Sequence, residues 1–281
     1  MKRLTAVLLL SILTICLLSC SESGSDKKIS LKFKYKPDMR LEYKQDSKQQ
    51  TTVYQNDSVI EKSSDSYIAF INQEVRSVES DSTFKIYEED IWRYTVPNKE
   101  DSTKKDTVEQ VREMELFVQD NGKILDFEFL SGEKQRYSYI KNYYEQGLPI
   151  FPKDEVHTGY SWTQTTSVVL PNETMKASTT YKINSLVREL GYDCAIIKYN
   201  GNLIIPIEPT KSDSTNRSGL DKITTDGMIY FAYKEGIVIK QTEKWTTKGD
   251  RIYIKDGKYE KYNFVSDYDV LFLLTKAEGV K

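Results

Sequence analysis

Hydrophobic and polar residues alternate along most of the chain, starting near Leu31. Leu31, Phe33 and Tyr35 fall on one side of an extended segment, with lysines between them. Ile252 and Ile254 repeat the pattern near the other end. A period of two, in runs rich in Tyr, Ile, Val and Thr, is typical of antiparallel strands with one buried face. The pattern therefore predicts a mostly β protein built on an antiparallel sheet.

Short polar segments that contain glycine separate these runs and predict tight turns. They lie at residues 120–122, 235–236, 248–250 and 256–257. Most of the seven prolines and thirteen glycines also fall between the runs, where they do not interrupt strand pairing.

An internal repeat with an offset of 114 residues divides the patterned region into two related halves. The matched pairs keep their residue type or their apolar character: Met114 with Met228, Phe117 with Phe231, Gly122 with Gly236, Ile124 with Val238, and Tyr67 with Tyr181. The halves cover about 31–130 and 150–245, and C-terminal strands follow at 246–281. Chance periodicity among apolar residues is the alternative explanation.

One helix is predicted between the halves, at residues 133–146. Ser131 can cap it, and Tyr137, Ile140 and Tyr144 recur at helical spacing. The simpler interpretation is a connecting helix that packs one face on the sheet. The alternative is a lid over a concave sheet.

The N-terminus has the pattern of a secretory signal. Lys2 and Arg3 precede an apolar run at residues 4–18, which is shorter than the roughly 20 residues that a membrane-spanning helix needs. The run ends at Leu-Leu-Ser-Cys, residues 17–20, which resembles the lipobox of bacterial lipoproteins. An ordinary cleaved signal or an N-terminal anchor helix is the alternative.

The lipobox resemblance implies cleavage before Cys20 and acylation of that residue, with palmitate or similar chains. Two or three acyl chains hold a protein firmly on a membrane. Residues 1–19 are then the signal peptide, 20–28 a lipidated tether, and 29–281 a single β-rich domain. Ser21, rather than Asp, follows the modified cysteine, which by the same resemblance implies the outer membrane of a Gram-negative bacterium.

Composition restricts the functional classes. The chain has 281 residues, of which 38% are hydrophobic, and 40 Lys+Arg balance 42 Asp+Glu. The apolar content is enough for a core, and the absence of a basic excess argues against a nucleic-acid partner. Once Cys16 is removed and Cys20 is acylated, Cys194 is the only free thiol, so no intramolecular disulfide can form.

Candidate catalytic and metal-binding residues are few. His157 is the only histidine, and it stands in a polar segment beside Gly159, which predicts a solvated loop position rather than a zinc ligand. Cys194 lies in a strand pattern and is expected to be a small buried core residue. No Gly-x-Ser-x-Gly motif supports a nucleophile. The sequence therefore predicts no catalytic residue, no metal site and no cofactor, with a hydrolase as a minor alternative.

Two further groups of residues have both a structural and a functional interpretation. The acidic runs at 88–90 and 154–155 lack calcium-loop spacing and are expected to be solvated turns. Trp92, Trp162 and Trp245 lie in or beside predicted strands. Tryptophans in such positions either anchor a β core or line a ligand site.

A family resemblance rests on the lipobox, the strand-rich halves, Phe-Pro at 151–152, and Val-x-x-Gly-Tyr-Ser-Trp at 156–162. Together these resemble a group of bacterial envelope lipoproteins. Their architecture is similar to that of the periplasmic lipoprotein carriers, in which a curved antiparallel sheet forms an open half-barrel closed by helices. The carriers lack a lipid anchor, which is a departure from the pattern seen here.

The resemblance implies a membrane-anchored binding module for a lipid-like or other apolar molecule. The positions predicted to contact that ligand are Tyr137, Ile140, Tyr144 and Trp162. The alternative function is a structural or adaptor lipoprotein that docks a protein partner through sheet edges and through the long polar loops at 96–107 and 206–222.

Overall fold

The computed structural model folds the chain into one antiparallel sheet of eleven strands. The residues it describes are 27–79, 82–97, 104–131, 148–169, 174–207, 218–255 and 258–280. The strands are β1 (Arg40–Gln55), β2 (Ser58–Val78), β3 (Thr83–Pro97), β4 (Lys105–Gln119), β5 (Ile124–Ser131), β6 (Ser161–Val169), β7 (Thr174–Glu189), β8 (Tyr192–Ile207), β9 (Ser218–Ala232), β10 (Ile237–Lys255) and β11 (Lys258–Glu278).

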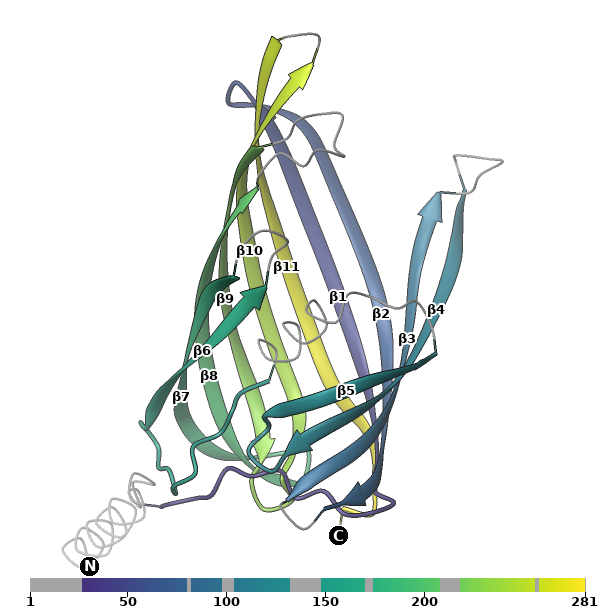
Figure 1. Cartoon of the computed structure of the whole chain (residues 1–281), viewed down its shortest axis with the longest axis vertical. Coiled ribbons are helices and arrows are strands. Elements are labelled where there is room, and N and C mark those ends of the chain that lie inside the picture. Colours follow the sequence, from purple (N-terminus) through teal and green to yellow (C-terminus); the bar gives the residue numbers. More distant parts are fainter. Residues whose placement is uncertain are drawn as a thin grey trace, which may run out of the picture.

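The sheet is open and curved, with β5 and β6 at its two edges. Its order is β5-β4-β3-β2-β1-β11-β10-β9-β8-β7-β6, so every neighbouring pair is a sequential hairpin except β1 with β11. The sheet bends so that β3–β5 and β6–β8 flank the central strands β1 and β11 (Figure 1). The predicted mostly β class and the curved, open antiparallel sheet are confirmed.

The described part of the chain contains no helix, and therefore none that could cross a membrane. The helix predicted at 133–146 and the signal peptide at 1–19 lie outside the described residues. Both remain predictions.

The strand order repeats between the two halves, but the residue register does not. Strands β1–β5 and strands β6–β10 each form a meander of sequential hairpins, and both meanders run across the sheet in the same direction. Met114 on β4 is fully buried, whereas its match Met228 on β9 is only partly buried, beside the buried Ile229. The connecting turns differ in length: five residues separate the paired Val118 and Ile124, whereas four separate the paired Ala232 and Ile237. Because of this one-residue difference, residues of β4 and β9 that match at an offset of 114 point to opposite faces of the sheet.

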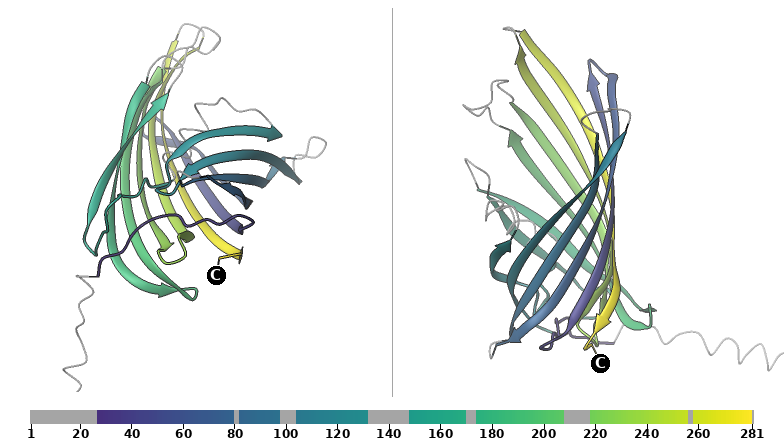
Figure 2. Two further views of the ribbon diagram at one scale, coloured as in Figure 1. Left: turned by 60° about the horizontal axis from the view of Figure 1, so that its bottom comes forward. Right: turned by 90° about the vertical axis from the view of Figure 1, so that its right-hand side faces the viewer.

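Two segments cross one face of the sheet and bury its apolar end. We call residues 27–39 the N-terminal strap, and the second segment is 148–160. The strap lies across one end of the sheet (Figure 2, left). The alternation from Leu31 predicted a strand of the sheet, and this was wrong. The strap is extended, but its only ladder contact among the described residues is an isolated bridge from Ile29 to Val156.

The strap alternates because it packs face-on against the sheet rather than beside a strand. Leu31 and Phe33 are buried, and the Phe33 ring lies 5.4 Å from that of Phe151 and 5.5 Å from that of Phe231. These centroid separations are typical of favourable aromatic pairs. Below, the sheet face that the strap covers is called the inner face, and the opposite one the outer face.

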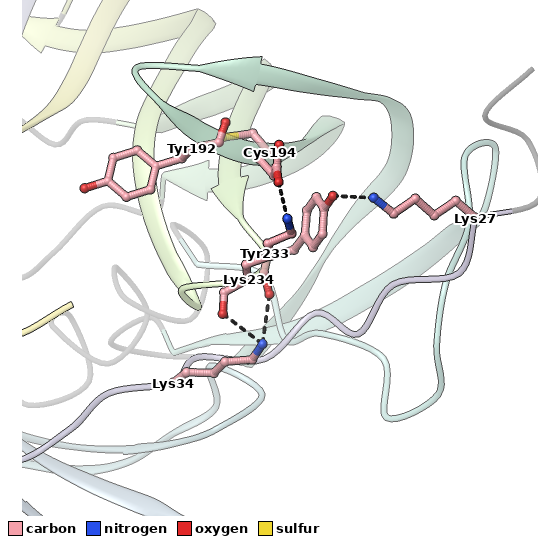
Figure 3. A network of polar contacts seen from close by, with 7 residues as sticks. Lys27, Lys34, Tyr192, Cys194, Tyr233 and Lys234 are labelled. Atoms are coloured by element: carbon pink, nitrogen blue, oxygen red, sulfur yellow. Dashed lines mark hydrogen bonds and ion pairs between the residues drawn. The ribbon is translucent and has the colours of Figure 1, made fainter. Parts of the chain in front are cut away.

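Lysine contacts fix the strap to the turn between β9 and β10. The Lys27 Nζ donates to the Tyr233 hydroxyl at 2.7 Å, and the Lys34 Nζ donates to the carbonyls of Tyr233 and Lys234 at 3.0 Å each (Figure 3). The strap therefore keeps its position through polar as well as apolar contacts.

The turn predicted at 248–250 was also wrong, because β10 runs straight through it. Gly249 lies opposite Phe264 of β11, and a Cβ on Gly249 would clash with the Phe264 ring. Glycine here gives an aromatic ring space to lie over a strand rather than forming a turn. Strand β10 also continues past residue 245, where the sequence placed the end of the second half.

Candidate functional site

The inner face changes character along each strand with distance from the strap. On β1, Leu41 and Tyr43 are buried in the apolar core near the strap. Farther along the same face, Gln45 and Ser47 are buried polar residues, and the Gln45 Nε2 donates to the Ser47 Oγ at 3.0 Å. Gln49 follows and donates to the Ser266 Oγ of β11 at 3.0 Å. A polar belt thus lies beyond the apolar end of the sheet.

Three aromatic side chains lie at facing positions on neighbouring strands of this face. Trp162 of β6 stacks on Tyr181 of β7 with ring centroids 5.2 Å apart, and Tyr181 lies 5.6 Å from Tyr199 of β8. We call this row the aromatic ladder. The Trp162 Nε1 donates to the Ile150 carbonyl at 3.1 Å, which fixes the first ring against residues 148–160. On β9 the row continues at Gly227, where a Cβ would clash with the Tyr199 ring.

Glu243 of β10 lies directly opposite Gly227 of β9 in the sheet, at the end of the ladder. The Gln241 Nε2 donates to the Tyr199 hydroxyl at 2.9 Å, and Tyr199 also hydrogen-bonds the Glu243 carboxylate. Burial raises the pKa of Glu243 to about 7, although the Tyr199 hydrogen bond acts in the opposite direction. Burial, followed by the nearby Glu243 charge, raises the pKa of Tyr199 well above its usual range. Glu243 is half-buried rather than enclosed.

A second pair of stacked rings lies on the same face, next to Glu243. Trp245 follows Glu243 by two positions on β10, and its ring lies 4.5 Å from that of Tyr268 on β11. Tyr67 of β2 and Trp92 of β3 form another pair at 5.3 Å. All of these rings are half-buried. The chain's three tryptophans therefore share the inner face.

The sequence predicted a solvated turn for the acidic run at 88–90, and this was wrong. Glu88 and Asp90 are 2% and 3% exposed, on the inner face of β3. The Gln73 Nε2 of β2 donates to Glu88 at 2.7 Å, and the Arg112 guanidinium of β4 pairs with Asp90. Burial raises the pKa of Asp90, against the effect of Arg112. Partners on two other strands, which local sequence does not reveal, allow these acids to be buried.

The residues with nucleophile or metal-binding potential occupy the positions that the sequence predicted. His157 is exposed, and its Nδ1 lies 2.9 Å from the Thr158 carbonyl. Cys194 is fully buried behind the Tyr233 turn, and burial raises the pKa of its thiol to about 11 (Figure 3). In the ranges with described structure, no group of three His, Cys, Asp or Glu side chains is arranged to hold a metal ion.

Of the four residues predicted to contact a ligand, Trp162 lies in the aromatic ladder. The other three fall outside the described residues: Tyr137, Ile140 and Tyr144. Sequence reasoning missed Tyr199 and Glu243, and it named Trp245 only as a tryptophan that either anchors the core or lines a ligand site. The period-two pattern assigns each of these residues to one face of its own strand, but it does not show which strands become neighbours in the sheet. Nothing in the sequence alone would have placed Glu243 beside Tyr199.

The chain was also compared with known proteins. A family of unknown function, DUF6263, matches residues 134–230. The matched region includes β6, β7, β8 and most of β9, and with them the whole aromatic ladder. Curated proteins give no match to the chain.

Proposed function

We propose that this protein is a non-catalytic lipoprotein of the bacterial cell envelope that binds an amphiphilic, lipid-like molecule on the inner face of its sheet. Acylated Cys20 anchors it, and Ser21 directs it to the outer membrane. The observation that carries the proposal is the concentration of half-buried aromatic rings on one face of an open, curved sheet. Ligand sites for small molecules are lined mainly by apolar and aromatic side chains with a few placed polar groups.

The strap supports this interpretation because it fills only one end of the inner face. Phe33 and Phe151 pack there against each other and against the fully buried Phe231 of β9. Beyond them, Trp245 and Tyr268 stack on each other but stay half-buried. Tryptophan and tyrosine commonly occupy surfaces where one end of the side chain is apolar and the other wet. An apolar chain lying on these rings, with a polar group at the belt, would match both parts.

The geometry of the strap also fits a lipid anchor. Lys27 is held at the Tyr233 turn, and only seven residue steps separate it from Cys20. A fully extended chain spans about 3.5 Å per residue, so the packed end of the sheet would lie within about 25 Å of the membrane surface. The aromatic part of the inner face would then lie beyond the packed end.

One observation favours the alternative, an adaptor that docks a protein partner. Several apolar side chains on the outer face are exposed by more than a third, among them Ile68 of β2, Val111 of β4 and Leu271 of β11. Exposed apolar side chains on one face can mark a protein interface. The proposal and the alternative therefore assign binding to opposite faces of the same sheet.

Residue-level photocrosslinking distinguishes the two faces. The full-length protein in lipid nanodiscs is irradiated with a short-chain alcohol that carries a diazirine, and the labelled residues are mapped by mass spectrometry. We expect labels at Trp245 and Tyr268, and their loss in Trp245→Asp but not in the matched outer-face variant Leu271→Asp. Labels confined to the outer face would overturn the proposal.

A further inference from the structure

We infer that the polar group of the ligand is a protonated amine and that the Glu243 carboxylate is its counter-ion, with the Tyr199 and Trp245 rings beside it. This inference rests on the proposed function and specifies the ligand class. Its basis is a comparison of Glu243 with two inner-face acids that pair with arginine, the rings around Glu243, and the acceptors that surround it.

Glu243 differs from two other acids on the same face. Asp90 pairs with Arg112, and the Asp221 carboxylate accepts two hydrogen bonds from Arg251, at 2.5 and 2.8 Å. No Lys or Arg in the described part of the chain pairs with Glu243, whose partner is the Tyr199 hydroxyl. A carboxylate withdrawn from water without a counter-ion is costly. A cationic ligand would supply the positive charge that Arg supplies to Asp90 and Asp221.

Aromatic rings lie on both sides of Glu243 along the inner face. Tyr199 reaches it over Gly227, which has no side chain to separate them. Trp245 is the next inward-facing residue on β10 and stacks on Tyr268. The faces of tyrosine and tryptophan attract ammonium groups, more strongly where water is partly excluded. An anionic group would instead meet both the ring faces and the carboxylate with repulsion.

The acceptors around Glu243 favour an amine that retains N–H donors. The carboxylate offers several lone pairs, and the Gln241 side chain presents an amide oxygen while its nitrogen donates to Tyr199. A primary ammonium can donate to both and place its remaining surface against a ring. The amine could belong to a lipid headgroup or to a free alkylamine or polyamine, and the test below separates these sources.

The raised pKa of Glu243 gives the inference a pH signature. With a pKa of about 7, the carboxyl is largely protonated at pH 6 and largely ionised at pH 8. The titratable groups that act on Glu243 are Tyr181 and Tyr199, both of which stay neutral in this range. Affinity for an ammonium ion should therefore rise with pH between 6 and 8. An uncharged ligand of the same length should show little change.

Calorimetric titration of the full-length protein in nanodiscs, with protein-free discs as the blank, tests this directly. The probes are hexylammonium, hexanol and hexanoate. We expect hexylammonium to bind about tenfold more tightly than hexanol at pH 8, and to lose most of that advantage at pH 6. Glu243→Gln should abolish the preference and keep hexanol binding. Glu61→Gln, the same change at an exposed position of β2, should keep both.

Each other result has a defined meaning. Equal affinity for hexylammonium and hexanol, or an unchanged preference in Glu243→Gln, overturns the amine inference but leaves the proposed function standing. No binding of any probe overturns both. If Glu243→Gln fails to fold, the pH dependence of the unaltered protein decides alone. Spermidine and short-chain phosphatidylethanolamine, with short-chain phosphatidylglycerol as control, then identify the source. Stronger binding of phosphatidylethanolamine indicates a lipid headgroup, and stronger binding of spermidine a free polyamine.

Discussion

Gly122 and Gly236 lie in two turns that contact the N-terminal strap and occupy equivalent places in the two halves of the sheet. Both have positive φ angles, of 89° and 72°. A Cβ on Gly122 would lie 2.8 Å from the Phe33 ring, and one on Gly236 would lie 2.6 Å from the Lys32 carbonyl oxygen. The two glycines are separated by the same 114 residues as the sequence repeat. The repeat is therefore most evident at the two turns against which the strap closes.

This relationship predicts a large penalty for a methyl group at Gly236. Gly236→Ala adds backbone strain and a collision with strap backbone, so we expect a loss of roughly 2–4 kcal/mol in the free energy of unfolding. Gly191→Ala is the matched control, because Gly191 has a φ of 84° but a Cβ there would meet nothing within 4 Å. It should lose only about 1 kcal/mol. Equal losses in denaturant unfolding would show that the strap does not press on the turn.

Glu243 makes the stability of the fold depend on pH. Its pKa rises from about 4.3 in an unfolded chain to about 7 in the folded protein. A raised carboxyl pKa adds stability below the unfolded value, and this stability is lost as pH rises through the folded value. Partial exposure reduces the effect to roughly 2 kcal/mol.

Denaturant unfolding at pH 5 and pH 8 measures this loss in buffer free of amines. Glu243→Gln should remove most of the decrease, whereas the exposed Glu61→Gln should preserve it. An identical pH dependence in Glu243→Gln and the unaltered protein would refute the raised pKa.

The buried pair of Arg112 and Asp90 should be sensitive to the loss of one partner. Arg112→Met leaves the Asp90 carboxylate buried without its cation, which typically costs about 3–5 kcal/mol. Arg93→Met removes an ion pair with Glu109 on the same two strands, where both side chains are 49% exposed, and should cost less than about 1 kcal/mol. Chemical denaturation of the two variants compares these values, and a similar small loss in both would contradict the burial of the pair.

The Cys194 thiol should resist alkylation in the folded protein. It is fully buried, and its pKa of about 11 keeps the reactive thiolate scarce near pH 8. Iodoacetamide should modify it readily only in concentrated urea. Mass spectrometry of the peptide that contains Cys194 measures the extent, and equal rates in both conditions would be inconsistent with this burial.

Local patterns were sufficient to predict the fold class but not the neighbours of each strand. Alternation identified the antiparallel sheet because one face of nearly every strand is buried. The turns at Gly122 and Gly236 were also predicted, since hairpin turns depend on a few adjacent residues. The pairing of β1 with β11 joins opposite ends of the chain, and no local pattern indicates it. The same alternation at Leu31 predicted a strand but belongs to the strap, because any extended chain with one buried side shows a period of two.

The candidate site depended on contacts between distant residues. Trp162 was predicted as a ligand contact, but Glu243 was not, because its position beside Tyr199 requires the order of β8, β9 and β10. Gly249 was predicted to lie in a turn, because the sequence does not show that an aromatic ring from a neighbouring strand lies over this glycine. Glu88 was expected in solvent because acidic residues are rarely buried unless paired. In each case the missing information was the identity of the neighbouring strand.

Tryptophan fluorescence tests the central claim, that the inner face binds an apolar ligand, most directly. All three tryptophans lie on that face, and the double variant Trp92→Phe, Trp162→Phe leaves Trp245 as the only tryptophan, which is excited selectively over the tyrosines at the red edge of the absorption band. A short-chain alcohol with a terminal bromine, a contact quencher, is titrated against its unbrominated parent. We predict saturable quenching of Trp245 by the brominated alcohol alone, reversed by an excess of the parent. Quenching that never saturates, or that the parent does not reverse, would contradict the account.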